Sequence, residues 1–283
     1  MTDQIEQDHA LLSYMGDDRV VPVEELKQII ASRPTPILYK SKFPNIDRYI
    51  EGFECGELTV LSGTPKGGKS LFLQTLTMKF HEQNVRTLWL SYELTNKQFI
   101  DRFPVLPPII MPLSMKPHDL DWVRAKIQEG VVKYNTRAVM IDHMHYLIQM
   151  GGARNSSLDI GGVARALKRM AVELNVMIFL VWHTGKVEPG RAPTSYDIRD
   201  SSFAMQEPDT VLMIWRVDNN GEMENRVMVL ASRRTGCMEK IVDFKKVNGW
   251  LEEKLINPIT NYPYGLKPKP QKEVTDAELF GNR

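Results

Sequence analysis

The chain has 283 residues, of which 42% are hydrophobic and 25% are charged, and this composition suits a globular protein and excludes disorder throughout. Its 36 lysines and arginines nearly balance its 35 aspartates and glutamates, so any binding to nucleic acid must be local. Two cysteines, Cys55 and Cys237, have no paired spacing, which argues against both a disulfide framework and a zinc site. Because no apolar run is long enough to span a membrane and the acidic N-terminus is unlike a signal peptide, we expect a cytoplasmic protein with no membrane partner.

Residues 1–35 are expected to form an acidic tail and a short helix from Val23 to Ser32, ended by Pro34. Apolar residues recur there on one helical face, at Val23, Leu26, Ile29 and Ile30. This stripe is too small to form a core by itself. The helix should therefore dock on this subunit or on another one.

Residues 36–256 are expected to form one α/β domain, and residues 257–283 a polar tail without a fixed fold. Short apolar runs alternate with helical stretches, which predicts a twisted, mainly parallel sheet with helices on both faces. Strands are predicted at 58–62, 87–92, 138–142, 176–182, 210–215, 227–231 and 240–244. Thr95 and Gln98 form a capping-box pattern, and a core-facing helical stripe comprises Val163, Leu167, Met170, Ala171 and Leu174.

A phosphate-binding loop is predicted directly after the first long strand, where residues 63–70 match the pattern GxxxxGK[ST]. Backbone N–H groups of such a loop converge on phosphate oxygens at a helix N-terminus, Lys69 reaches the β- and γ-phosphates, and Ser70 ligates Mg²⁺. The sequence therefore predicts a site for ATP and Mg²⁺. The residues predicted to bind the nucleotide are Gly63, Thr64, Pro65, Lys66, Gly67, Gly68, Lys69, Ser70 and Leu71.

Two carboxylates are candidates for the chemistry beside this loop. Asp142 ends an apolar strand where a second ligand for Mg²⁺ belongs, although an Asp after a strand often serves only as a cap or turn. Glu93 lies just past the second long strand and is a candidate base for a water molecule. From spacing alone, Glu93 fits equally well as a surface residue near a helix start.

Several segments, taken in order, resemble the RecA-like ATPase domain of the DnaB and Twinkle family of hexameric replicative helicases. The resemblance covers about residues 40–252 and implies a RecA-like fold. It is carried by residues 56–63, 86–93, 139–145, 166–176, 182–183, 197–201 and 233–236. The phosphate loop alone would fit many ATPases, whereas this ordered set is far more specific.

The resemblance implies roles for single residues. Glu93 matches the catalytic glutamate, and His183 stands where the family carries a Gln or His that senses the γ-phosphate. Arg234 aligns with the arginine finger that reaches the ATP of the neighbouring subunit. Without the family pattern, His183 would be a hydrogen-bonded strand-end histidine and Arg234 a solvated surface charge. Many family members carry a Lys two residues before the finger; this chain has Ser232 there, which leaves Arg233 as a substitute.

Residues 149–159 and 185–197 resemble the family's central-channel loops. Arg154, Lys186 and Arg191 lie in them among small and polar residues, a setting that suits contact with a phosphate backbone without reading of bases. A plain solvated loop fits each of these residues nearly as well. The segment that begins with Asp197, Arg199 and Asp200 is expected to order the second loop internally.

The resemblance implies an ATP-driven, ring-forming translocase on single-stranded DNA, a replicative-type helicase whose partners are further copies of itself, as a hexamer, and replication proteins. The helix at 23–32 resembles the family's linker helix, which packs on an adjacent subunit. Two other functions stay open: a RadA- or KaiC-like recombination or regulatory ATPase, and a nucleotide-dependent loader or assembly module that does not unwind DNA.

Overall fold

The computed structural model describes residues 11–16, 18–148, 156–185, 187, 191–198, 205–219 and 221–255. It divides the chain into two units, Met1–Ile37 and Leu38–Arg283. In the first unit, α2 (Val23–Ser32) has the bounds that the apolar spacing predicted, and Pro22 stands at its N-terminal cap position. None of the helices that the structure describes is long and apolar enough to cross a membrane.

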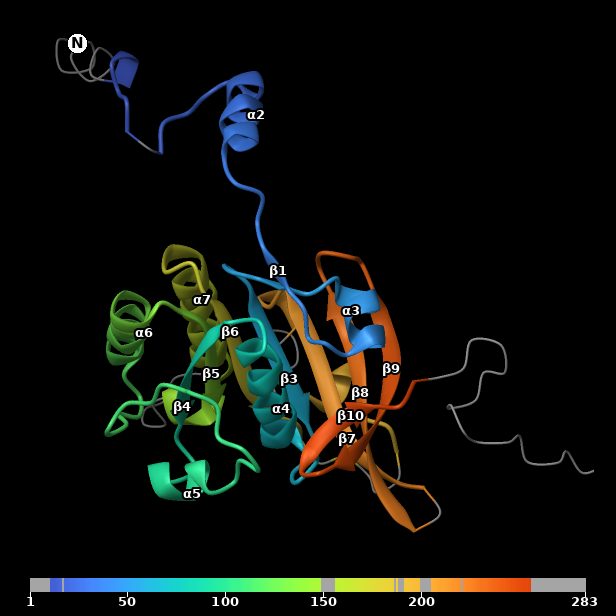
Figure 1. Ribbon diagram of the computed structural model, residues 1–283. Helices are drawn as coiled ribbons and strands as arrows, with labels where there is room; N and C mark the ends of the chain where they lie inside the picture. Colours follow the sequence, from blue (N-terminus) through green and yellow to red (C-terminus); the bar gives the residue numbers. More distant parts are fainter. Residues whose placement is uncertain are drawn as a thin grey trace, which may run out of the picture. The chain divides into compact units, whose positions relative to one another are not determined.

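The second unit is built on an eight-stranded sheet (Figure 1). Its strands, in sheet order, are β10 (Trp250–Glu253), β9 (Met238–Val247), β8 (Glu222–Ser232), β7 (Thr210–Asn219), β3 (Leu58–Gly63), β6 (Met177–His183), β5 (Thr136–Asp142) and β4 (Arg86–Ser91). Strands β7, β3, β6, β5 and β4 are parallel to one another, whereas β8 pairs antiparallel with β7, β9 with β8, and β10 with β9. The predicted α/β class and the seven predicted strands are confirmed.

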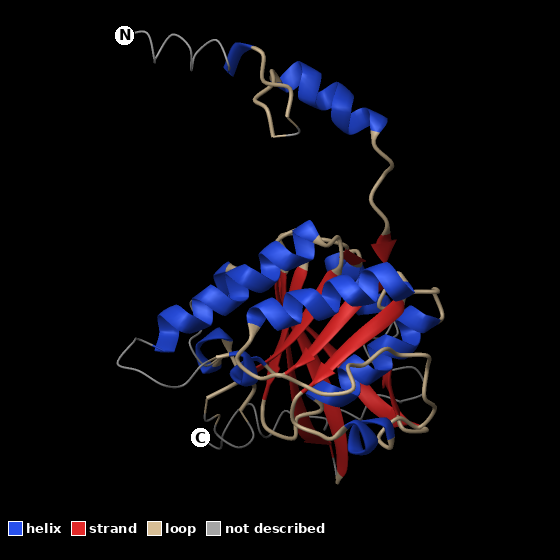
Figure 2. Ribbon diagram, turned by 90° about the vertical axis from the view of Figure 1, so that its left-hand side faces the viewer, coloured by secondary structure: helices blue, strands red, loops and turns tan. Residues whose placement is uncertain are grey.

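Helices cover both faces of this sheet, because successive side chains of a strand point to opposite sides. Leu61 packs with apolar side chains of α3 (Pro44–Ile50) and α4 (Lys69–His81), whereas Val60 packs with those of α6 (Leu120–Tyr134) and α7 (Ser156–Glu173). Figure 2 shows long helices lying across one face of the sheet. A strand between two helical layers has no solvent face, so every residue of β3 is buried.

The local signals predicted from the sequence are also found. Thr95 and Gln98 form the reciprocal capping box of α5 (Asn96–Ile100). The predicted helical stripe lies in the core, with Leu174 only partly buried. Four shorter elements belong to the same fold: the paired strands β1 (Leu38–Tyr39) and β2 (Phe53–Glu54), and the 3₁₀ turns η1 (Met144–Leu147) and η2 (Ser195–Asp197).

The sheet topology brings the carboxyl ends of the parallel strands to one edge, where ligands bind in open α/β sheets. In the register of the sheet, Gly63 at the end of β3 pairs with His183 at the end of β6. Ser91, the last residue of β4, pairs with Asp142, the last residue of β5. Residues far apart in the sequence therefore meet at this edge.

Candidate functional site

The phosphate loop joins β3 to α4 and depends on its glycines. Gly63 has φ 153°, and a Cβ there would lie 2.0 Å from the carbonyl oxygen of Ile214. A Cβ on Gly67 would lie 2.8 Å from the carbonyl oxygen of Thr64. Any side chain at these positions would force the loop apart. No side chain caps the N-terminus of α4, so the first N–H groups of this helix are left for a ligand.

Lys69 is buried in this loop. Its Nζ donates hydrogen bonds to the carbonyl oxygens of Gly63, at 2.9 Å, and Thr64, at 3.0 Å. Burial lowers the pKa of Lys69, while the nearby carboxylates of Asp142 and Glu93 oppose this effect. An anion in the loop would supply the opposite charge that a buried ammonium needs.

Ser70 and Asp142 bring α4 and β5 together. The Ser70 hydroxyl donates a hydrogen bond of 2.8 Å to Asp142 Oδ2. Burial raises the pKa of Asp142 to about 6, although this hydrogen bond and the Lys69 charge favour the ionised carboxylate. A hydroxyl and a carboxylate are hard oxygen ligands of the kind Mg²⁺ prefers, and a cation would also compensate the buried charge. These two residues fit the predicted metal site.

A cavity of about 560 Å³ lies over the loop and gathers most of the predicted site residues. The side chain of Glu93 is 42% exposed, and its Oε1 lies 3.6 Å from Nδ1 of His143. Burial lowers the pKa of His183 to about 4, so its imidazole is neutral at neutral pH. The residues lining the cavity are Pro65, Lys66, Gly67, Gly68, Lys69, Ser70, Leu71, Glu93, Arg102, Asp142, His183 and Arg216.

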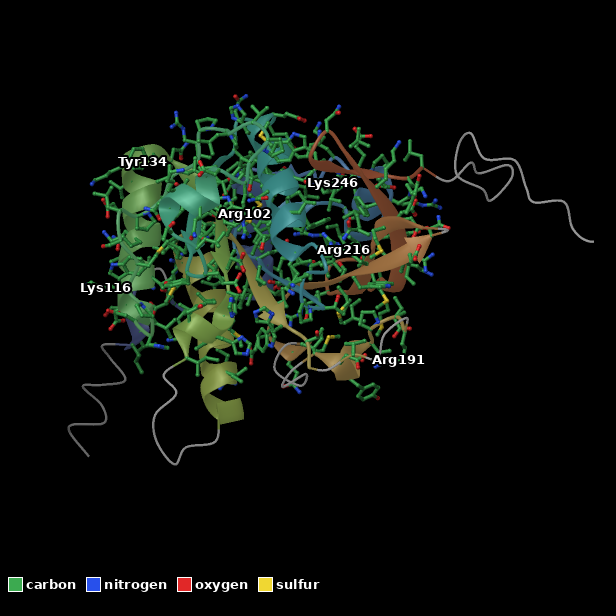
Figure 3. The ribbon with its side chains drawn as sticks, turned by 90° about the horizontal axis from the view of Figure 1, so that it is seen from below. Arg102, Lys116, Tyr134, Arg191, Arg216 and Lys246 are labelled. Atoms are coloured by element: carbon green, nitrogen blue, oxygen red, sulfur yellow. The ribbon has the colours of Figure 1, made fainter. Side chains whose placement is uncertain are left out.

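Three residues of this site were missed by the sequence reasoning. Arg102, just after α5, and Arg216, on β7, line the cavity, and both are labelled in Figure 3. Asn225 on β8 donates a hydrogen bond of 2.7 Å from Nδ2 to the carbonyl oxygen of Gly67 and so holds the loop in place. Arg216 could have been found from the order of the strands. Ile214 on β7 pairs with Gly63, and Arg216, two positions further along β7, points to the same side of the sheet as Ile214.

Arg234 lies away from this cavity in its own chain. It follows β8, where its Nη2 donates a 2.6 Å hydrogen bond to Glu54 and also pairs with Glu57. Glu57 directly precedes β3, whereas the phosphate loop follows that strand. The two positions are thus separated by about 20 Å, the length of a six-residue strand. Neighbouring Arg233 donates to the carbonyl oxygen of Gln206 at 2.7 Å.

Of the predicted nucleic-acid residues, the described structure includes Arg191, whereas Arg154 and Lys186 lie outside the described residues. Arg191 Nη1 donates a hydrogen bond of 3.0 Å to Asp197 Oδ2, and hydrogen bonding by Arg191 lowers the pKa of Asp197 to about 2. Asp197 also accepts from the backbone N–H and hydroxyl of Thr194. Asp197 therefore orders this loop internally, as expected; Arg199 and Asp200 lie outside the described residues.

Comparison with known proteins gives the family. Residues 109–248 match the model of the DnaB-like helicase C terminal domain. This chain therefore contains a DnaB-like helicase C-terminal domain. ATPase domains of this family imply binding of a nucleotide.

Relatives and solved structures agree with this assignment. The chain is 22% identical to a probable replicative DNA helicase of Trieres chinensis and 24% identical to the replicative DNA helicase DnaB of Mycoplasma pneumoniae. These matches cover 73% and 81% of this chain, but only 55% and 59% of the two relatives. A solved structure of an ATPase domain superimposes with a TM-score of 0.68 at 18% identity, covering 81% of this chain and 96% of that domain.

A second solved structure, a DnaB-like replicative helicase described with its interactions with primase, gives a TM-score of 0.67 at 18% identity. It covers 89% of this chain and 70% of that chain. The DnaB-like domain thus has the RecA-like fold that the sequence predicted.

Proposed function

We propose that this chain is the motor of a ring-forming, ATP-driven translocase that unwinds DNA as a replicative helicase. One observation carries the proposal: the predicted catalytic groups meet at one edge of the sheet, while the predicted arginine finger lies at the opposite edge. A site divided in this way is complete only where two copies of the chain meet. The names of the relatives, all replicative helicases, support the same function.

Within one copy, the loop residues and Lys69 would hold the phosphates of ATP. Ser70 and Asp142 would hold Mg²⁺, which supplies positive charge to the phosphate oxygens. Glu93 is exposed enough to reach water and would orient or deprotonate the attacking molecule. His183, neutral and lining the cavity, would contact the γ-phosphate and report its presence to the loop that follows β6.

The neighbouring copy would supply Arg234, whose guanidinium can spread over the transition-state oxygens. Helix α2, whose apolar stripe is too small for a core of its own, would dock on an adjacent copy as a linker. A ring of six copies is the arrangement that the family resemblance implies. Arg154, Lys186 and Arg191 would face the single strand in the centre of this ring.

The test is strand displacement. Purified protein with ATP and Mg²⁺ should separate a forked duplex, and a Lys69→Ala variant should not, because it lacks the charge that holds the phosphates. Ring particles should appear by negative-stain imaging with a non-hydrolysable ATP analogue and single-stranded DNA. Hydrolysis of ATP without strand displacement would favour the RadA- or KaiC-like ATPase, and assembly without appreciable hydrolysis would favour the loader module.

A further inference from the structure

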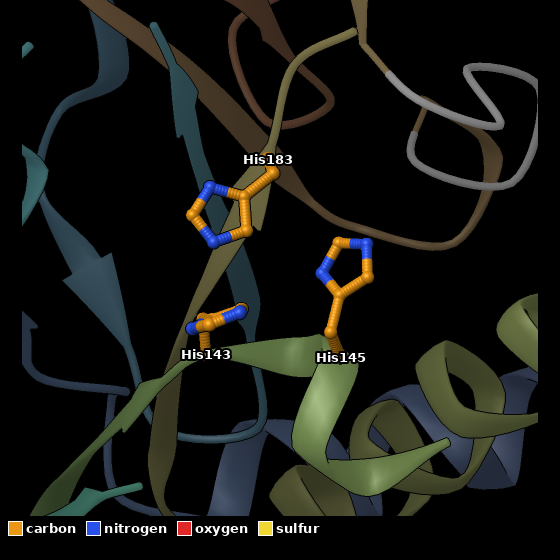
Figure 4. A group of neighbouring side chains, drawn as sticks. All are labelled: His143, His145 and His183. Atoms are coloured by element: carbon orange, nitrogen blue, oxygen red, sulfur yellow. The ribbon is translucent and has the colours of Figure 1, made fainter. Parts of the chain in front are cut away.

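Three histidines gather at the carboxyl edge of the sheet, and the proposed reaction uses only one of them. His143 directly follows β5, His145 lies in η1, and His183 ends β6. Their ring centroids are 5.4 Å apart for His143 and His145, 4.1 Å for His143 and His183, and 5.3 Å for His145 and His183. Figure 4 shows the three rings around a common space.

The nitrogen atoms of these rings are placed for a shared ligand. One nitrogen from each histidine lies within 4.8 Å of the other two. With Zn–N bonds of about 2.0–2.1 Å, a tetrahedral ion needs these nitrogens roughly 3.3 Å apart. Binding of the ion would therefore draw the three rings closer together. The ring of Tyr146 packs edge-on against His143, at 4.9 Å between centroids, and limits the movement of that ligand.

His143 carries an independent sign of a missing ligand. It is 8% exposed, and its Nδ1 has no hydrogen-bond partner among the residues that the structure describes. The nearest acid, Glu93, lies 3.6 Å away, beyond hydrogen-bond distance. A buried nitrogen without a partner is costly, so such an atom calls for a specific explanation.

The chemistry of the three rings selects the class of ion. Each of the three side chains offers one imidazole nitrogen as its ligand atom. Neutral imidazoles suit Zn²⁺, Co²⁺, Ni²⁺ and Cu²⁺, whereas Mg²⁺ prefers oxygen ligands. The cysteine spacing, which argued against zinc, does not bear on a site built from histidine alone.

We propose that His143, His145 and His183 form a binding site for a transition-metal ion of the zinc class, next to the nucleotide cavity. An ion held there would fix the ring of His183, which lines that cavity. The three protein ligands leave a fourth position open to water or to another ligand, as in zinc sites that are not purely structural. The site is separate from the Ser70 and Asp142 pair assigned to Mg²⁺.

Zinc binding by the nucleotide-free protein tests this proposal independently of any ATPase or helicase activity. The metal-free chain, kept in excess Mg²⁺, is titrated with Zn²⁺ against a chromophoric chelator. We expect one Zn²⁺ per chain. His145→Gln should weaken Zn²⁺ binding by about 100-fold or more, since even an outer-shell partner of a metal ligand is worth about 10- to 100-fold. His81→Gln, at an exposed histidine at the end of α4, is the matched control and should bind as the wild type does.

Two further variants keep the test decisive. His145→Cys replaces one zinc ligand by another, so it should retain Zn²⁺ and give the Co²⁺-loaded protein a new thiolate charge-transfer band. Asp142→Asn should also retain Zn²⁺. If Asp142→Asn loses the ion while His145→Gln keeps it, the ion belongs to the neighbouring group of Glu93, Asp142 and His143, and the proposal is overturned. Wild-type protein that takes up no Zn²⁺ or Co²⁺ in excess Mg²⁺ would overturn it as well.

Discussion

At the scale of single residues, the proposed nucleotide site combines side chains that are buried in the fold with side chains that lie at its surface. Asp142 is buried at the end of a core strand, and Lys69 is tied to the carbonyl oxygens of its own loop. Glu93 lies at the rim with 42% of its side chain exposed. Substitution of Glu93 should therefore change ATP hydrolysis without changing the stability of the fold, whereas substitution of Asp142 should change both.

Glu93→Gln should leave ATP binding intact and lower ATP hydrolysis by about 10²- to 10⁴-fold, because the water loses its general base. The amide has the same shape and cannot accept the proton. Nucleotide binding by fluorescence and phosphate release measure the two properties separately, with Lys69→Ala as the variant that loses binding too. Normal phosphate release by the Glu93→Gln variant would show that another residue is the general base.

Asp142→Asn should stabilise the metal-free, nucleotide-free protein at about pH 8. The folded-state pKa of Asp142 is raised from 3.8 to about 6, so the unfolded chain ionises first and the free energy of unfolding falls as pH rises through this window. The asparagine amide does not ionise, so the variant does not lose this free energy of unfolding. The loss in the wild type is at most about 3 kcal/mol for a shift of about two pKa units. Urea unfolding in EDTA should show the difference at about pH 8 and its disappearance near pH 4.

The same measurement on Asp121→Asn, at an exposed aspartate in the first turn of α6, gives the control for a change in surface charge. An Asp142→Asn protein no more stable than the wild type at the higher pH would show that the buried carboxylate is stabilised by contacts other than those described.

Some residues of the site could be predicted from the sequence because each lies in a local pattern. The phosphate loop has a fixed spacing and Asp142 ends an apolar run, whereas His183 was predicted only from the family resemblance. Arg102 and Arg216 have no such pattern. They reach the cavity through the packing of α5 and the position of β7 beside β3, which are long-range consequences of the fold. Local sequence holds no signal for such a contact.

At the scale of elements, the strands with continuous apolar runs were predicted well because burial on both faces leaves few polar residues in them. Strand β10 was missed because it has only four residues, two of them glutamates. A signal was nevertheless present. Asn248 and Gly249, with φ of 49° and 88°, form the two-residue turn between β9 and β10, and an Asn-Gly pair is the strongest short hairpin signal.

Arg234 lies in the turn between β8 and β9. Arg234→Ala should leave ATP binding nearly unchanged and lower hydrolysis by up to about 10³-fold, in the range of a removed arginine finger. The defect would lie in the neighbour's site. Mixed rings of Arg234→Ala and Lys69→Ala chains should therefore recover part of the activity, since some interfaces then pair an intact loop with an intact finger.

Arg226→Ala is the matched control, because Arg226 is also paired with a carboxylate, Asp243 at 2.7 Å, on the same antiparallel part of the sheet. It should hydrolyse ATP as the wild type does. If co-assembled mixtures of Arg234→Ala and Lys69→Ala recover nothing, then Arg234 acts in its own subunit or only holds Glu54 and Glu57 in place.

At the scale of the whole molecule, the order of strands gives the arrangement that the proposed shared site requires. The parallel strands gather the nucleotide residues at their carboxyl ends, and the antiparallel β8 returns the chain to the other edge, where Arg234 follows it. The loops after β5 and β6 leave from the nucleotide edge. The predicted DNA loops therefore begin at the same strand ends that carry Asp142 and His183, so a change in the bound nucleotide could be passed to them directly.

Single-stranded DNA should therefore stimulate ATP hydrolysis, and its affinity should fall with salt as cationic side chains displace counterions from phosphate. Arg191→Ala should weaken DNA binding equally for all sequences and flatten the salt dependence by about 0.7 units of slope, the value of one phosphate contact on a single strand. Asp197→Asn tests the same ion pair by changing the carboxylate instead of the arginine. Its amide oxygen can still accept from Thr194, but it loses the charge that holds Arg191, so DNA affinity should stay the same or rise. Fluorescence anisotropy over a salt series measures both variants. If the two lose affinity alike, Arg191 serves to order the loop and the DNA contact lies elsewhere.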